Sequence, residues 1–300
     1  SEIVGHAADP IGAVLSALET HGKHDDSANI QDDSASMNER CAEWGIKFFG
    51  CIAESREHAF SLHKEHKIVD VIIRTVKKDQ PDSDDVAMAC VFAFDSLASA
   101  YEDGEGAALR PIAVDIANKD GLDIIFDLME TLAATGDDLD SQEDDRAIDS
   151  SIGVMIACVQ HGTDLMTVLI DKGGLDKLAN VINCFHSTAV VVRGACELIT
   201  SLAQASQTAG VDIPEATKTN LVIACRNIVK YHMSQPFLLP VLTMMVSLSH
   251  FWGASITRHV IKDAIGILRE HSTNLCLCQQ AANLLGIAAK DGRNKEILAY

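Results

Sequence analysis

The sequence predicts an all-α protein, an α-solenoid in which short helical units are stacked along the chain. Apolar residues recur with helical spacing over nearly all of the 300 residues, and alternating strand patterns are scarce. A long apolar segment rich in Ala, Ser, Gly and Cys returns at nearly regular intervals. Aromatic residues make up only 5% of the chain, which suits a thin core shared by neighbouring units better than one globular centre.

The long apolar segment occurs six times, and each copy predicts a long helix. The copies are residues 40–55, 86–100, 148–160, 191–205, 238–250 and 278–290. Alignment on their shared ending gives the equivalent positions Cys51, Ser96, Cys158, Ser201, Ser247 and Gly286. These positions are 45, 62, 43, 46 and 39 residues apart, and four of the spacings lie near the period of about 40–47 residues of small helical units. Insertions at residues 102–110 and 135–146 explain the longest spacing.

A shorter helical pattern accompanies the long one. Its copies are residues 121–132 and 174–185, with weaker ones at 10–21, 67–78, 219–230 and 262–270. Because one such unit cannot bury its own apolar face, neighbouring units have to cover it. We therefore expect a single repeat domain over residues 1–300. Both ends fall within a unit, so we also expect the chain to be a fragment of a longer protein.

Two motifs, at residues 172–178 and 191–203, carry a resemblance to the armadillo-repeat family that covers nearly the whole chain and is strongest over residues 110–205. The stretch 172–178 (KGGLDKL) is followed by 191–203 (VVRGACELITSLA), and residues 120–125 (DGLDII) form a second copy. The Gly173–Gly174 pair suits a sharp turn between two helices, where a positive φ favours glycine. The resemblance implies a right-handed superhelix of about six armadillo-like repeats, with HEAT repeats as the closest alternative.

The net charge of −19 is concentrated in the first half of the chain. Residues 1–150 hold 33 acidic side chains against 12 Lys and Arg, a net charge of −21, whereas residues 151–300 are nearly neutral. Phosphate backbones and anionic lipids repel such a chain, which disfavours nucleic-acid and membrane-surface binding. No apolar run reaches the roughly 20 residues of a membrane span, so we expect no membrane insertion. The charge favours basic protein partners; the alternative is that the acids only keep the protein soluble.

Three acidic loops, at residues 23–33, 79–85 and 135–146, follow copies of the shorter helical pattern. Equivalent turns of a solenoid line up along one edge, so these loops predict an acidic edge that steers a basic partner. The residues expected on this acidic edge include Asp82, Asp84, Asp85, Asp137, Asp138 and Asp140.

The armadillo resemblance also implies a concave groove lined by the long helices. Nuclear import receptors of the family hold an extended peptide there with Trp and Asn four residues apart, and no equivalent pair of this sequence has that combination. A nuclear import receptor is therefore disfavoured. Small hydroxyl and thiol side chains and one aromatic residue suit a partner peptide or helix instead. The residues expected to line the groove are Lys47, Cys51, Phe92, Ser96, Val154, Cys158, Glu197, Ser201, Thr243 and Ser247.

The nine cysteines predict a reducing environment. Their number is odd, most lie inside apolar runs such as residues 89–92, and the sequence has no Asn-x-Ser/Thr sequon. Cysteines of this kind are core residues with free thiols, which favours a cytoplasmic protein.

These observations together predict a protein-binding scaffold or adaptor and no enzyme. No Walker, GxGxxG, GxSxG, HExxH or CxxC motif occurs, and we expect no cofactor. A chaperone-like role and a role in cytoskeletal or organelle docking are alternatives that the family resemblance allows. A metal-dependent hydrolase that uses His58, His63 and His66 is an alternative of another class. The competing interpretation of residues 54–66 is a solvated turn between helices.

Overall fold

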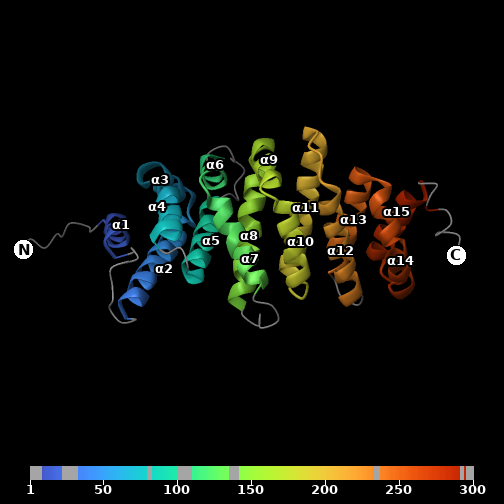
Figure 1. Ribbon diagram of the computed structural model, residues 1–300, viewed down its shortest axis with the longest axis horizontal. Coiled ribbons are helices and arrows are strands. Elements are labelled where there is room, and N and C mark those ends of the chain that lie inside the picture. The colour runs from blue at the N-terminus through green and yellow to red at the C-terminus, as the bar shows by residue number, and fades with distance from the viewer. Residues whose placement is uncertain are drawn as a thin grey trace, which may run out of the picture. The chain divides into compact units, whose positions relative to one another are not determined.

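A computed structural model of the chain describes residues 9–21, 33–79, 83–99, 110–134, 142–232, 237–290 and 294. In these ranges the regular structure consists of fifteen α-helices and one short π-helix, with no strand (Figure 1). This confirms the all-α prediction. The chain forms two compact units, Ser1–Leu128 and Met129–Tyr300, and the boundary falls inside helix α7.

The first unit is built around helices α2 and α5, which pack along each other. Its elements are α1 (Pro10–His21), α2 (Asp33–Ala53), α3 (Arg56–His66), α4 (Ile68–Arg74), η1 (Thr75–Asp79), α5 (Asp84–Ser99), α6 (Arg110–Asn118) and most of α7 (Gly121–Ala134). Helix α2 lies between α1 and α5. A Cβ atom added to Gly45 would lie 2.7 Å from the Leu18 side chain of α1. One added to Gly50 would lie 3.2 Å from Cα of Ala93 on α5, so the small residues permit close helix packing.

Most of the segment 54–66 is helical, since α3 spans Arg56–His66, which corrects the interpretation of this segment as a solvated turn. Helix α3 starts after Ser55, whose hydroxyl accepts a hydrogen bond from the backbone N–H of His58. Ala59 and Leu62 are fully buried and lie three residues apart, so they form the inner face of the helix. The many charged residues of this segment occupy the remaining faces, which hides the apolar periodicity.

The second unit contains two rows of helices that pack against their neighbours. Its elements are the end of α7, then α8 (Gln142–Gln160), α9 (Thr163–Asp171), α10 (Gly174–Cys184), α11 (Ala189–Ala209), α12 (Glu215–Tyr231), α13 (Leu238–Trp252), α14 (Ala254–Glu270) and α15 (Leu275–Lys290). The longer helices α8, α11, α13 and α15 pack in that order, and α10, α12 and α14 form the second row (Figure 1). This arrangement is compatible with an α-solenoid.

Side-chain hydrogen bonds connect successive helices of the second row. Asp176 of α10 accepts hydrogen bonds from Thr217 Oγ1 at 2.7 Å and from Asn220 Nδ2 at 3.1 Å, both on α12. Further along the same pair of helices, Asn227 Nδ2 donates to Asn183 Oδ1 at 2.9 Å. These polar contacts fix how far α12 is shifted along α10, which apolar packing alone leaves loosely determined.

The cysteines are free thiols, and several belong to the core, as the sequence predicts. Cys90, Cys158, Cys196 and Cys225 are buried. Burial raises the pKa of the Cys158 and Cys225 thiols to about 12, so both stay protonated and behave as small apolar residues. Among the described residues, no helix has both the length and the apolar character required to cross a membrane.

Gly173 adopts the positive φ that the sequence predicts for the turn before α10. Its φ is +77°, and a Cβ atom added there would meet no other atom within 4 Å. A substitution at Gly173 therefore tests backbone conformation without a steric clash. Asp120 has a φ of +69° at the equivalent place before α7, where an aspartate tolerates the same left-handed conformation.

We expect Gly173→Ala to lower the free energy of unfolding by about 1 kcal/mol, because an L-residue is strained at this φ. Gly286→Ala is the matched control, since Gly286 lies inside α15 and is equally free of close neighbours. This control substitution should raise the free energy of unfolding by about 0.5–1 kcal/mol. Urea unfolding of the wild type and the two variants measures both effects. Equal stability of the two variants would contradict the positive φ assigned to Gly173.

Candidate partner-binding surface

Four of the predicted groove residues lie on the two central helices of the first unit. Lys47 and Cys51 belong to α2, and Phe92 and Ser96 belong to α5. Cys51 is exposed and the other three are half-buried, so all four reach the surface. The ammonium group of Lys47 donates a hydrogen bond to Glu43 Oε1 at 2.6 Å, and this ion pair within α2 reduces the positive charge that Lys47 offers to a partner.

Sequence reasoning missed the most exposed apolar residues of this surface. Met37 and Trp44 have 73% and 68% of their surface exposed, and they precede Cys51 by four and two helical turns. The Trp44 ring centroid lies 5.9 Å from Lys47 Nζ. The spacing of seven residues between Met37, Trp44 and Cys51 was visible in the sequence. A search limited to pairs four residues apart overlooks it.

The second unit presents the predicted residues of α11 and α13 at its surface. Glu197 and Thr243 are exposed, and Ser201 and Ser247 are half-buried. The two serine hydroxyls donate hydrogen bonds to backbone carbonyls one turn earlier in their own helices, at 3.0 and 3.1 Å. Both donor protons are thus engaged, and these hydroxyls present mainly acceptor lone pairs to a partner.

Val154 and Cys158 do not line any surface, which corrects the prediction for α8. Both side chains are fully buried. On this helix Gln142 and Arg146 are exposed and Asp149 is half-buried, and their spacing of three to four residues marks the solvent side. Alignment on a shared helix ending misses the rotation that these polar residues impose.

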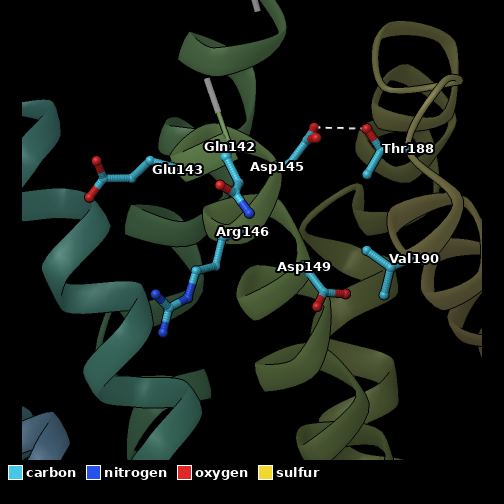
Figure 2. A pocket seen from close by; sticks show the side chains of 7 residues that line it. All are labelled: Gln142, Glu143, Asp145, Arg146, Asp149, Thr188 and Val190. Atoms are coloured by element: carbon cyan, nitrogen blue, oxygen red, sulfur yellow. Dashed lines mark hydrogen bonds between the residues drawn. The ribbon is translucent and has the colours of Figure 1, made fainter. Parts of the chain in front are cut away.

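A cleft of about 910 Å³ opens between the first turns of α8 and the segment that leads into α11 (Figure 2). Its lining residues are Gln142, Glu143, Asp145, Arg146, Asp149, Thr188 and Val190. The Thr188 hydroxyl donates a hydrogen bond to Asp145 Oδ1 at 2.8 Å and joins the two walls. Three carboxylates and one guanidinium line the cleft, and Val190, which is 39% exposed, adds an apolar patch.

Asp149 is a carboxylate of the cleft whose pKa is changed by its surroundings. Partial burial raises its pKa, and the positive charge of Arg193 on α11 offsets only part of this effect. The ionised carboxylate of Asp149 is therefore less stable in the folded protein than in water. A cation placed in the cleft would stabilise it.

The raised pKa of Asp149 predicts a stability effect with a defined sign. Between the ordinary value of 3.8 and the higher folded value, the folded state binds more protons, so this group lowers stability as the pH rises through that window. Asp149→Asn should raise the melting temperature at about pH 7 and lose this advantage below pH 3.8. The control Asp212→Asn changes a side chain that is 98% exposed and should have little effect.

The acidic edge is described only in part. Asp84 and Asp85 lie exposed in the first turn of α5. Asp82, Asp137, Asp138 and Asp140 lie outside the described residues. The edge as a whole therefore stays a prediction.

The histidines of the metal-site alternative have other partners. His63 Nε2 lies 2.9 Å from Asp115 Oδ2, and His58 Nδ1 lies 2.9 Å from the Ser55 hydroxyl. His66, at the end of α3, is half-buried. Within the described ranges, no three His, Cys, Asp or Glu side chains are grouped so that they could hold a metal ion. The described geometry thus gives the hydrolase alternative no support.

Asp115 is the centre of a polar network in the first unit. Lys119 Nζ lies 2.9 Å from Asp115 Oδ2 and 3.0 Å from Asp70 Oδ1, so α3, α4 and α6 are joined through His63, Asp70 and Asp115. Burial by itself would raise the pKa of Asp115. Hydrogen bonds from Lys119 and His63 together outweigh burial and lower this pKa.

We expect Asp115→Asn to lower the melting temperature at neutral pH, because the ionised carboxylate is stabilised only in the folded state. This contribution is present above the ordinary pKa of 3.8 and is lost as the pH falls through the lower folded value. Thermal unfolding as a function of pH should therefore show the wild type and the variant converging in acid. Glu65→Gln, a change at an exposed acid of α3, is the control that should show no such convergence.

Comparison with known proteins connects this chain to others through its fold alone. No family model matches the sequence, and no curated protein matches it. One similar solved structure is an engineered protein from the Northeast Structural Genomics Consortium, with a TM-score of 0.57, 13% identity and coverage of 94% of this chain and 100% of that one. A second engineered protein from the same consortium has a TM-score of 0.56, 11% identity and coverage of 93% and 96%.

Proposed function

We propose that this chain is a protein-binding scaffold or adaptor, built from a right-handed array of armadillo-like repeats, that holds a basic segment of a partner. The repeat spacing in the sequence and the neighbour-to-neighbour packing of the long helices support the armadillo-like arrangement. Because a fold does not determine a function, the proposal rests on the chemistry of the surface.

The observation that carries the proposal is the acidic cleft between α8 and α11. Glu143, Asp145 and Asp149 line the cleft together with Arg146 and the exposed methyl groups of Val190, so the acids outnumber the one base (Figure 2). A lysine or arginine fits this combination, because its methylene stem covers apolar surface while its charged end reaches the carboxylates. The buried part of Asp149 makes such a cation more favourable there than at an exposed acid.

Chaperone-like activity and docking to the cytoskeleton or to an organelle are alternative roles for the same surface. Each requires a partner segment, and the described residues do not distinguish among them. The buried free thiols support a cytoplasmic location as part of this proposal.

Selection of peptides from a random 12-residue display library tests the basic-segment proposal. We expect the enriched peptides to contain Lys or Arg and to bind less tightly as salt is raised from about 50 to 200 mM. The double variant Glu143→Gln/Asp149→Asn should weaken their binding about tenfold, since two charge-assisted contacts are lost.

The matched control for charge is the double variant Glu215→Gln/Asp212→Asn, at two exposed acids near the start of α12. It changes the net charge equally and should leave peptide binding within about twofold. An equal loss of peptide affinity in both double variants would show that only the overall charge matters and would contradict a role for the cleft.

A further inference from the structure

We propose that the surface of α2 and α5 around Trp44 and Phe92 binds an amphipathic helix of a partner protein, with the basic flank of that helix over α5. We call the residues Met37, Trp44, Cys51, Met88 and Phe92 the α2/α5 patch. This inference deepens the proposed scaffold function and rests on it. It adds a second contact surface, in the first unit, and specifies the chemistry of its occupant.

The two helices of the patch run in the same direction. Ser83, just before α5, donates a hydrogen bond to Glu39 near the start of α2, and eleven residues later Gly50 packs against Ala93. A residue of α2 thus lies level with the residue about 44 positions later on α5. Trp44 is therefore level with Met88, and Phe92 follows one turn further along α5.

The patch contains two large apolar side chains that are mostly exposed. Met37 and Trp44 are 73% and 68% exposed, whereas Met88 and Phe92 on α5 are half-buried. Met37 and Cys51 are fourteen residues apart, so the α2 side of the patch is about 21 Å long. Tryptophan and methionine gathered on one exposed surface are typical of protein interfaces.

The chemistry of the patch favours a helical occupant. An extended peptide leaves its backbone N–H and C=O groups to be satisfied by the protein, as in clamps built from amide side chains. The α2/α5 patch offers two thioethers, an indole, a phenyl ring and a thiol, which cannot do this for several successive residues. A helix makes its backbone hydrogen bonds internally, so it can bind the patch through apolar side chains at i, i+3, i+4 and i+7 alone.

The charges next to the patch favour a basic flank on that helix. Asp84 and Asp85 are exposed in the first turn of α5, and Asp95 lies half-buried one turn beyond Phe92. On α2, Lys47 is paired with Glu43, and Arg40 is exposed between Met37 and Trp44. Among the described residues, the three aspartates of α5 still outnumber this one arginine, so the charge beside the patch is negative on balance. A second copy of this chain is a poorer occupant, because it would bring another net charge of −19 to the same surface.

A helix-biased display library tests this inference. Its 18-residue peptides carry Leu at i, i+3, i+4 and i+7 and are randomised at the flanks. Selection uses the whole chain, with counter-selection against Trp44→Ser. The protein used for detection carries Trp252→Phe, which leaves Trp44 as its single tryptophan. We expect enriched peptides with Lys- or Arg-rich flanks, and their binding should shift Trp44 emission to shorter wavelength and reduce acrylamide quenching.

Two substitutions and a charge-reversed peptide locate the contact. Phe92→Glu should raise the Kd of an enriched peptide at least tenfold, as measured by anisotropy of the labelled peptide. Trp44→Ser, at a position that is 68% exposed, should do the same. Phe60→Glu is the matched control, since Phe60 is 40% exposed on α3 outside the patch, and it should leave the Kd unchanged. Peptides with Glu in place of each Lys and Arg should bind at least tenfold more weakly.

Each other outcome overturns the inference. It fails if no peptide is enriched, if enriched flanks are acidic, or if Trp44 emission is unchanged by binding. Self-association that Trp44→Ser abolishes, seen by sedimentation, would assign the patch to a second copy instead. The cleft double variant Glu143→Gln/Asp149→Asn keeps the two proposals apart. If no helical peptide binds at the patch but basic peptides still bind at the cleft, only this inference is wrong. If helical peptides bind at the patch but the cleft double variant leaves basic-peptide binding unchanged, the proposed role of the cleft is wrong.

Discussion

Burial of apolar surface between neighbouring helices is the interaction on which each unit depends. A long helix of this protein is apolar on more than one side, and it covers those sides by packing against several neighbouring helices, as α11 does against α8, α9, α10 and α13. Glycine and alanine at these contacts let the backbones approach closely, as Gly50 and Ala93 show. The remaining side of each long helix stays at the surface, and the two candidate binding surfaces lie there.

The periodicity of the sequence was sufficient to predict the helical class and the position of the long helices. It was insufficient for α3, α6 and α9, which have eleven, nine and nine residues. Two or three turns give little periodic signal, and in α3 charged residues surround the two buried positions. The spacing pattern could not decide the handedness of the array either, because handedness is set by crossing angles that a sequence does not display.

The candidate surfaces were harder to predict than the helices that carry them. Alignment of repeats assumes that every unit presents the same rotation, and α8 breaks this assumption because its polar residues turn Val154 and Cys158 inward. The cleft beside α8 depends on the meeting of Asp145 with Thr188, which are 43 residues apart in the chain. Trp44 was visible in the sequence, yet its exposure depends on how α1 and α5 flank α2.

The hydrogen bonds between α10 and α12 have a consequence for how this protein changes over evolutionary time. Asp176 and Asn183 on one helix are matched by specific donors on the next, so each unit is adapted to a particular neighbour. Duplication or exchange of a whole repeat would place these polar groups against helices that lack the matching donors. Growth of the chain is therefore easier through longer connections between helices than through extra copies of the building block.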